Sequence, residues 1–251
     1  MGKKVGGARP HFYSRGMSNS TGTKSKRSLT SKNEDFGSIL RLPILPVLAT
    51  IPNEKTALHV AEAFQKAGLP QIEITFRSPS SPAALQAVVR EFPEMVVGAG
   101  TLLTPAQVDQ ARDGGARFGV APGSNPRVLA AARKAGLPFL PGVATPTEIE
   151  VALELGFLWQ KIPGVMGNLR PFLDWLRGAY GHTGLRMVPA GGTTIDTLAQ
   201  NLDHPLIGAV AGSWIMPSEL VRDKKWDAIG ALAARSVQVV RDLEQRKRSG
   251  G

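Results

Sequence analysis

Short apolar runs alternate with helix-length amphipathic segments from about residue 40 to the end of the chain. There are eight such runs, and their apolar character throughout is typical of parallel strands buried on both faces. Strands that alternate with helices in this way predict an α/β fold of repeated strand–helix units. A doubly wound open sheet fits the same pattern, but eight units within about 210 residues favour a single (β/α)8 TIM barrel.

The apolar runs and the capping residues predict where each element begins and ends. We expect helices after Asn53, Thr104 and Thr145, whose side chains can accept a hydrogen bond from the first turn. Thr145 and Glu148 also have the spacing of a capping box. Strands are predicted at residues 44–48, 71–76, 95–98, 117–121, 138–143, 158–162, 185–190 and 206–211. Helices are predicted at 54–67, 82–91, 105–113, 126–135, 146–156, 169–180, 195–201 and 226–246, with a short one after the eighth strand.

The net charge of +10 is concentrated at the N-terminus. Residues 1–33 contain eight Lys and Arg residues and no acid, which leaves about +2 for the rest of the chain. This segment is rich in Ser, Thr and Gly and poor in branched apolar residues, so it cannot bury enough surface to fold. We therefore expect a disordered basic tail over residues 1–36 and the barrel over residues 37–251.

Three origins fit the basic tail. It could be an upstream extension with Met17 as the true start, an organelle transit peptide, or an arm that binds nucleic acid. Because the barrel itself is nearly neutral, nucleic acid is not an expected partner of the folded part. The protein is expected in the cytoplasm, or in an organelle stroma or matrix if the tail is a transit peptide.

Two absences narrow the chemistry further. The chain has no cysteine, which excludes disulfides, thiolate metal sites and a cysteine nucleophile. No apolar run approaches the roughly 20 residues that a membrane-spanning helix needs, so we expect a soluble protein without a membrane partner.

Glu73 is the first candidate for chemistry, since active residues of such barrels lie at the C-terminal ends of strands. In the run of residues 71–75, alternation places Ile72 and Ile74 on one face and Glu73 with Thr75 on the other. A carboxylate facing the helices would be costly, so Glu73 should point into the barrel. There it could act as a general acid and base, or it could belong to a buried structural ion pair.

Lys161 is the second candidate, at the end of the sixth predicted strand. It follows Trp159 by two positions and therefore shares its face. A desolvated lysine near another cation has a lowered pKa and becomes a nucleophile toward carbonyl groups. The alternative is a lysine at a strand end that simply reaches into water.

Small residues close several of the predicted strands. Gly98-Ala99-Gly100-Thr101 and Ala121-Pro122-Gly123 would allow a ligand to approach the backbone closely. Pro189-Ala190-Gly191-Gly192-Thr193 and Ala211-Gly212-Ser213 end strands seven and eight, where barrels of this class bind phosphate on backbone N–H groups. Ordinary tight turns are the alternative for each of these segments.

Together these segments resemble the 2-keto-3-deoxy-6-phosphogluconate (KDPG) aldolase family, class I aldolases that include 4-hydroxy-2-oxoglutarate (KHG) aldolases. The resemblance covers residues 40 to 245. It rests on Ile72-Glu73-Ile74-Thr75-Phe76-Arg77, Gly98-Ala99-Gly100-Thr101, Pro122-Gly123, the run from Pro141 to Glu148, Pro189-Ala190-Gly191-Gly192 and Gly212-Ser213-Trp214.

The resemblance implies a lyase that cleaves a KDPG-like sugar acid or KHG to pyruvate and an aldehyde. Lys161 matches the Schiff-base lysine and Glu73 the glutamate that transfers protons. Arg77 matches the arginine that holds the substrate carboxylate. Thr101, Pro122 and Thr145 match positions at the pyruvate pocket, and Gly191, Gly192, Gly212 and Ser213 match the phosphate cradle. The resemblance also implies a homotrimer, with no metal and no cofactor.

The segment around Lys161 departs from the family pattern. The family shows lysine, two apolar residues and then Pro-Ala-Glu or Pro-Gly-Glu, whereas Lys161-Ile162-Pro163-Gly164-Val165 is one residue shorter. Alignment backward from Pro163 places Gln160 at the nucleophile, and alignment forward from Leu155-Gly156 places Lys161 there. We prefer Lys161, because barrel geometry fixes strand length while the following loop tolerates a deletion.

Other functions remain open from the sequence. A metal-dependent sugar-phosphate epimerase would need inward His and Asp ligands, and none of the four histidines ends an early strand. A non-catalytic barrel that binds phosphate, or an aldolase of altered specificity, is consistent with the changed loop after Lys161.

Overall fold

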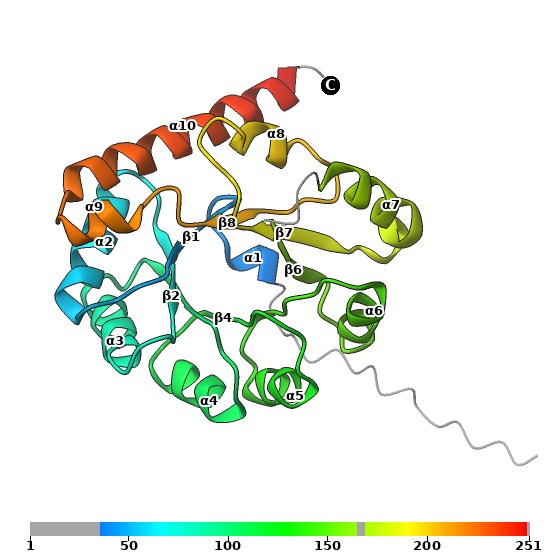
Figure 1. Ribbon diagram of the computed structural model, residues 1–251, viewed down its shortest axis with the longest axis horizontal. Helices are drawn as coiled ribbons and strands as arrows, with labels where there is room; N and C mark the ends of the chain where they lie inside the picture. Colours follow the sequence, from blue (N-terminus) through cyan, green and yellow to red (C-terminus); the bar gives the residue numbers. More distant parts are fainter. Residues whose placement is uncertain (1–35, 165–168, 250–251) are drawn as a thin grey trace, which may run out of the picture. The chain divides into compact units, whose positions relative to one another are not determined.

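The computed structural model describes residues 36–164 and 169–249, which form a (β/α)8 TIM barrel (Figure 1). The strands are all parallel and follow the order β5-β4-β3-β2-β1-β8-β7-β6. The predicted fold class is therefore confirmed. The strands are β1 (Ile44–Leu48), β2 (Gln71–Thr75), β3 (Val96–Gly100), β4 (Phe118–Val120), β5 (Phe139–Leu140), β6 (Trp159–Pro163), β7 (Arg186–Ala190) and β8 (Val210–Gly212).

Helices surround the strands, and the C-terminal helix lies across three of its neighbours (Figure 1). The helices are α1 (Phe36–Ile39), α2 (Glu54–Lys66), α3 (Ser81–Glu91), α4 (Pro105–Asp113), α5 (Pro126–Ala135), α6 (Pro146–Glu154), α7 (Arg170–Tyr180), the 3-10 turn η1 (Gly181–Thr183), α8 (Leu198–Leu202), α9 (Ser218–Arg222) and α10 (Trp226–Ser249). Helix α10 contacts α2, α8 and α9. None of the described helices is both long and apolar enough to span a membrane.

The sheet closes through Lys161. A single parallel bridge joins Gly142, just after β5, to Lys161 in β6. The Lys161 N–H donates to the Pro141 carbonyl at 2.8 Å, and the Val143 N–H donates to the Lys161 carbonyl at 2.8 Å. The backbone of the candidate nucleophile is therefore held on the strand that completes the barrel.

The predicted capping residues begin the helices as expected. The Asn53 side chain accepts from the Thr56 N–H at 3.0 Å, and Thr104 forms a capping box with Gln107. Thr145 and Glu148 form the predicted capping box at the start of α6. These contacts satisfy N–H groups that a helix N-terminus otherwise leaves without partners.

Two elements near β8 are shorter than predicted. The eighth strand was expected from residue 206, but 206–209 pair with β7 only through a bridge between Met187 and Ile207. Gly208 packs there against the Trp159 ring, where a methyl group would overlap it. Helix α8 starts at residue 198 rather than 195, because Thr194 and Thr197 form a turn through their hydroxyls, which compete with helical hydrogen bonds.

An unpredicted helix, α1, covers one end of the barrel interior. The Phe36 ring lies 5.3 Å from Phe118 and 5.8 Å from Trp159 between centroids, and only 3% of Phe36 is exposed. Residue 36, which the sequence placed in the tail, thus packs with the barrel core. The remainder of the predicted tail lies outside the described residues.

The core has an inner and an outer part, and this division orients the strand side chains. Ile72 and Ile74 of β2 pack with the surrounding helices in the largest apolar cluster. The inner cluster contains Phe36, Ile39, Leu45, Val47, Val96, Phe118, Val120, Leu140, Val188, Ala209 and Ala211, with Trp159 packed against it. Residues that alternate with Ile72 and Ile74 therefore face the barrel interior.

Candidate active site

Glu73 is a buried carboxylate inside the barrel. It is 1% exposed, and no described residue donates a hydrogen bond to either of its carboxylate oxygens. Burial raises the pKa of the Glu73 carboxyl, while the positive charges of Lys161 and Arg77 oppose that rise. Glu73 is thus a proton-binding group within electrostatic reach of the two predicted cationic site residues.

The absence of a side chain at Gly100 leaves the space that the Glu73 carboxylate occupies. A methyl group at residue 100 would overlap Glu73 Oε1 and would lie 2.7 Å from its Cδ. Because real Cβ atoms do not approach so closely, any side chain at this position would displace the carboxylate. This explains in steric terms why a glycine ends β3.

The side chains of β6 show which residue faces the interior. Gln160 is fully buried, and its Nε2 donates to the Ile149 carbonyl of α6 at 3.2 Å and to the Phe157 carbonyl at 3.0 Å. Gln160 therefore faces the helices, as does Ile162, which packs with Leu173 and Leu176 of α7. Lys161 lies on the opposite face and is partly buried. The position inside the barrel belongs to Lys161, not to Gln160.

Arg77 and Thr101 meet at the C-terminal ends of β2 and β3. Arg77 Nε donates to Thr101 Oγ1 at 3.1 Å, and Arg77 is exposed. Thr101 has a φ of 57°, a left-handed conformation that is strained for a β-branched residue. Such strain costs on the order of 1–3 kcal/mol and tends to occur at functional sites.

Pro122 and Thr145 follow β4 and β5 at the same end of the barrel, and both are exposed. Gly142 packs against the Pro122 carbonyl, where a methyl group would overlap it. The Thr145 hydroxyl accepts from the Glu148 N–H at 3.4 Å as the cap of α6. The observed contact of Thr145 is thus a capping bond, which leaves its hydroxyl hydrogen able to donate to a ligand.

The loops after β7 and β8 bring the predicted cradle residues together. Gly191 and Gly192 have φ values of 87° and 72°, which favour glycine. The Gly191 N–H donates to the Ala211 carbonyl at 3.1 Å, so the two strand ends are joined next to Gly212 and Ser213. The Gly164 N–H donates to the Ala190 carbonyl at 2.8 Å, so Gly164, directly after β6, borders the same cradle. Residues 165–168, including Val165 of the changed loop, lie outside the described residues.

A polar cavity of about 220 Å³ is lined in part by Gly191 and Gly192 of the predicted cradle. Gly164, Arg170, Gly191, Gly192, Thr193 and His204 are among its lining residues. His204 is buried; its Nδ1 accepts from the Leu206 N–H, and its Nε2 lies 3.2 Å from Asp174 Oδ1. Arg170 and His204 were not predicted as site residues, because no local motif connects them to the glycine loop.

The arrangement places a lysine, a carboxylate and an arginine at one end of a parallel barrel, beside glycine loops of the kind that hold phosphate. Comparison with known proteins agrees with this geometry. The sequence model of the KDPG and KHG aldolase family matches residues 37–232. The chain belongs to this family.

The chain matches individual family members over nearly the whole of their length. The 2-dehydro-3-deoxy-phosphogluconate aldolase of Treponema pallidum is 35% identical over 82% of this chain and 97% of its own. The KHG/KDPG aldolase of Escherichia coli is 28% identical over 78% of this chain and 91% of its own. KDPG and KHG aldolases are carbon–carbon lyases, so the expected enzyme class is confirmed.

A solved structure of a family member has a similar backbone. The KDPG aldolase of Legionella pneumophila, with pyruvate captured as a covalent carbinolamine intermediate, has a TM-score of 0.75 and 31% identity. The match covers 80% of this chain and 97% of that one. The family resemblance of the sequence motifs is therefore confirmed.

Proposed function

We propose that this protein cleaves 2-keto-3-deoxy-6-phosphogluconate or 4-hydroxy-2-oxoglutarate to pyruvate and an aldehyde through a Schiff base on Lys161. The observation that carries the proposal is the placement of Lys161 on the interior face of β6, with its charge acting on the buried Glu73. The covalent carbinolamine of pyruvate in the Legionella pneumophila relative supports the same chemistry.

The first half of the reaction forms the electron sink. The neutral Lys161 Nζ attacks C2 of the 2-oxo acid and gives a carbinolamine, which then loses water to form an iminium ion. Arg77 binds the adjacent carboxylate through two parallel N–H···O bonds and orients the ketone toward Nζ. The strained Thr101, which accepts from Arg77 Nε, holds the guanidinium in place.

The second half breaks the carbon–carbon bond. Glu73 removes the proton from the C4 hydroxyl, the C3–C4 bond breaks, and its electron pair moves into an enamine on Lys161. The aldehyde leaves, and Glu73 returns the proton to C3 of the enamine. Water then hydrolyses the resulting iminium, which releases pyruvate and regenerates Lys161. Burial raises the pKa of the Glu73 carboxyl above its ordinary value, which makes it a stronger base than an exposed carboxylate for the proton of the C4 hydroxyl.

The remaining predicted residues bind the substrate. Pro122 and Thr145 border the pyruvate end of the site, with the Thr145 hydroxyl hydrogen available to donate. Gly191, Gly192, Gly212 and Ser213 bind the phosphate of a phosphorylated substrate, through backbone N–H groups and the Ser213 hydroxyl. A substrate without phosphate depends only on the residues around Lys161.

Pyruvate release from both substrates tests the proposal. The wild-type protein should release pyruvate from at least one of them, and Lys161→Arg should abolish release because the guanidinium stays protonated. Lys66→Arg, an exposed position on α2, is the matched control and should retain the wild-type rate. A wild-type protein that cleaves neither substrate, or a Lys161→Arg variant with the wild-type rate, would contradict it.

We also propose that the protein is a homotrimer. Only the family resemblance supports this subunit number, and light scattering on the eluting peak of a sizing column measures it directly. A mass of one or two chains would overturn the trimer without affecting the proposed reaction.

A further inference from the structure

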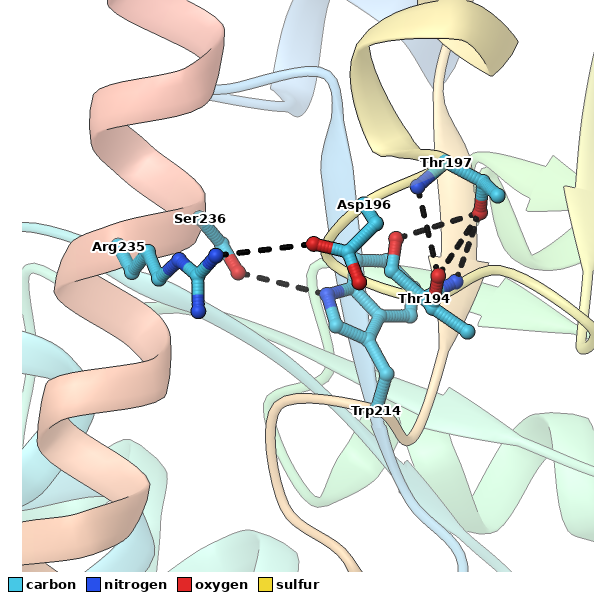
Figure 2. Close-up of polar contacts among 6 residues, drawn as sticks. All are labelled: Thr194, Asp196, Thr197, Trp214, Arg235 and Ser236. Atoms are coloured by element: carbon cyan, nitrogen blue, oxygen red, sulfur yellow. Dashed lines mark hydrogen bonds and ion pairs between the residues drawn. The ribbon is translucent and has the colours of Figure 1, made fainter.

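Helix α10 contacts both loops of the predicted phosphate cradle through two consecutive residues. Figure 2 shows Arg235 beside Asp196 of the loop after β7, and Ser236 beside Trp214 of the loop after β8. Trp214 Nε1 donates to Ser236 Oγ at 3.3 Å. Neither α10 residue reaches the barrel interior, so any influence on the substrate must pass through the loops.

Trp214 packs against the backbone of the cradle. A methyl group at Gly212 would lie 2.6 Å from Cε3 and 2.7 Å from Cζ3 of the indole. Trp214 is also the residue directly after Ser213. The orientation of the indole therefore limits where the Gly212 and Ser213 backbone can lie.

Ser236 is well placed to fix that orientation. It is completely buried, and its hydroxyl donates to the Leu232 carbonyl of its own helix at 2.9 Å. With its hydrogen engaged there, Oγ is left to accept from the indole N–H. The acceptor sits on a helix of 24 residues that packs along α2 and α8, so it is held firmly.

The neighbouring ion pair between Arg235 and Asp196 contributes much less to holding the loops. Arg235 Nη2 lies 3.6 Å from Asp196 Oδ1, and their side chains are 64% and 82% exposed. Exposed pairs of this kind are weak because water screens them. The loop after β7 is held instead by the reciprocal Thr194 and Thr197 bonds, of which Thr194 N–H to Thr197 Oγ1 is 2.9 Å (Figure 2).

We infer that Ser236 is a positioning residue for phosphate recognition: it holds Trp214, and through Trp214 it holds Gly212 and Ser213 in the geometry that binds the substrate phosphate. The inference rests on the proposed function. The Trp214–Ser236 contact supports the phosphate loops and not Lys161, Glu73 or Arg77. Its loss should therefore weaken binding of the phosphate end of the substrate and leave the reacting end unaffected.

The test compares Ser236→Ala with wild type on a phosphorylated substrate, 2-keto-3-deoxy-6-phosphogluconate, and an unphosphorylated one, 4-hydroxy-2-oxoglutarate. We expect KM for the phosphorylated substrate to rise about five-fold, which corresponds to about 1 kcal/mol, with little change in kcat. KM and kcat for the other substrate should stay at wild-type values. Inorganic phosphate, used as an inhibitor of the second reaction, should bind the variant about five-fold more weakly.

Ser249→Ala is the matched control. Ser249 lies on the same helix, and its hydroxyl likewise bonds the carbonyl four residues earlier, that of Gln245, at 3.0 Å. This variant should match wild type on both substrates. Trp214→Phe removes the indole N–H and also part of the ring that packs on Gly212, so it should raise KM for the phosphorylated substrate at least as much as Ser236→Ala. Because Ser236 acts through the indole N–H, adding Ser236→Ala to Trp214→Phe should cause no further rise.

Equal changes for the two substrates, or none for either, would overturn the positioning role. Should Ser236→Ala fail to fold, Trp214→Phe carries the same comparison. Failure of the proposed function looks different: the wild-type protein then releases no pyruvate from either substrate. A wild-type protein that cleaves only the unphosphorylated substrate retains its aldolase function and overturns the inference.

Discussion

Replacing Glu73 by Gln should make the fold less sensitive to rising pH while it removes most of the activity. The substitution keeps the size of the side chain and removes its charge. Glu73 is 1% exposed, and neither carboxylate oxygen has a hydrogen-bond partner among the described residues. Only Lys161 and Arg77 favour its ionised form, and burial outweighs them because the pKa is raised.

The sign of the effect follows from proton linkage. A folded state with a raised carboxyl pKa binds more protons than the unfolded state between the two pKa values, so stability falls as pH rises through that window. Below the unfolded pKa, both states are protonated and Glu73 adds no pH dependence. Above the folded pKa, the whole penalty is present. Leaving a buried polar group unsatisfied typically costs about 1–3 kcal/mol, which sets the expected size of the change.

Urea unfolding at pH 5, 6.5 and 8, followed by circular dichroism, measures the difference between wild type and Glu73→Gln. We expect the free energy of unfolding of the variant, relative to that of wild type, to rise by about 1–3 kcal/mol from pH 5 to pH 8. Removing the proton carrier should lower kcat by about 10²–10⁴-fold. A stability difference that stays constant across this pH range, or moves toward wild type, would refute the view that Glu73 is a buried carboxyl with a raised pKa.

Three further perturbations have defined outcomes. Gly100→Ala should displace the Glu73 carboxylate, lowering kcat at least tenfold and stability by about 1–3 kcal/mol, measured by pyruvate release and urea unfolding. Arg77→Lys keeps the charge but loses two-point binding of the carboxylate, so KM for either substrate should rise roughly tenfold or more; an unchanged KM would remove Arg77 from carboxylate binding. Dialysis against EDTA should leave the rate of pyruvate release unchanged, because the iminium ion serves as the electron sink. An activity that is lost on dialysis and restored by a divalent cation would contradict this mechanism.

Much of the site could be predicted because the alternation of residue types along a strand indicates which face each side chain takes. Ile72 and Ile74 are apolar and pack outward, so Glu73 between them had to face inward, and the structure places it there. The cap at Thr104 and the capping box of Thr145 with Glu148 were equally predictable, since their bonds join residues three apart. Local pattern suffices where the interacting groups are close in the chain.

The register of β6 could not be decided in this way. Gln160 and Lys161 are both polar, and the two alignments around them gave opposite answers. What decides between them is the pair of bonds from Gln160 to the carbonyls of Ile149 and Phe157, which turn Gln160 toward α6. These contacts depend on how α6 packs, which residue types alone do not show.

Contacts between distant segments were also invisible in the sequence. The Trp214 bond to Ser236 spans 22 residues, and the packing of Phe36 on Phe118 joins α1 to the middle of the barrel. Gly208 lies within the predicted range of the eighth strand, and the Trp159 ring occupies the space that a Cβ there would need. Each of these features depends on tertiary packing that overrides the local preference for strand, helix or loop.

Reduction with borohydride in the presence of pyruvate, followed by mass mapping of the peptides, identifies the residue that forms the Schiff base. Borohydride converts the iminium ion to a stable secondary amine, so the lysine that forms it becomes permanently labelled. We expect one pyruvate-derived adduct, on Lys161, and none when Lys161→Arg is treated in the same way. An adduct on any other residue, or no adduct in the wild-type protein, would contradict the assignment of Lys161 as the Schiff-base lysine.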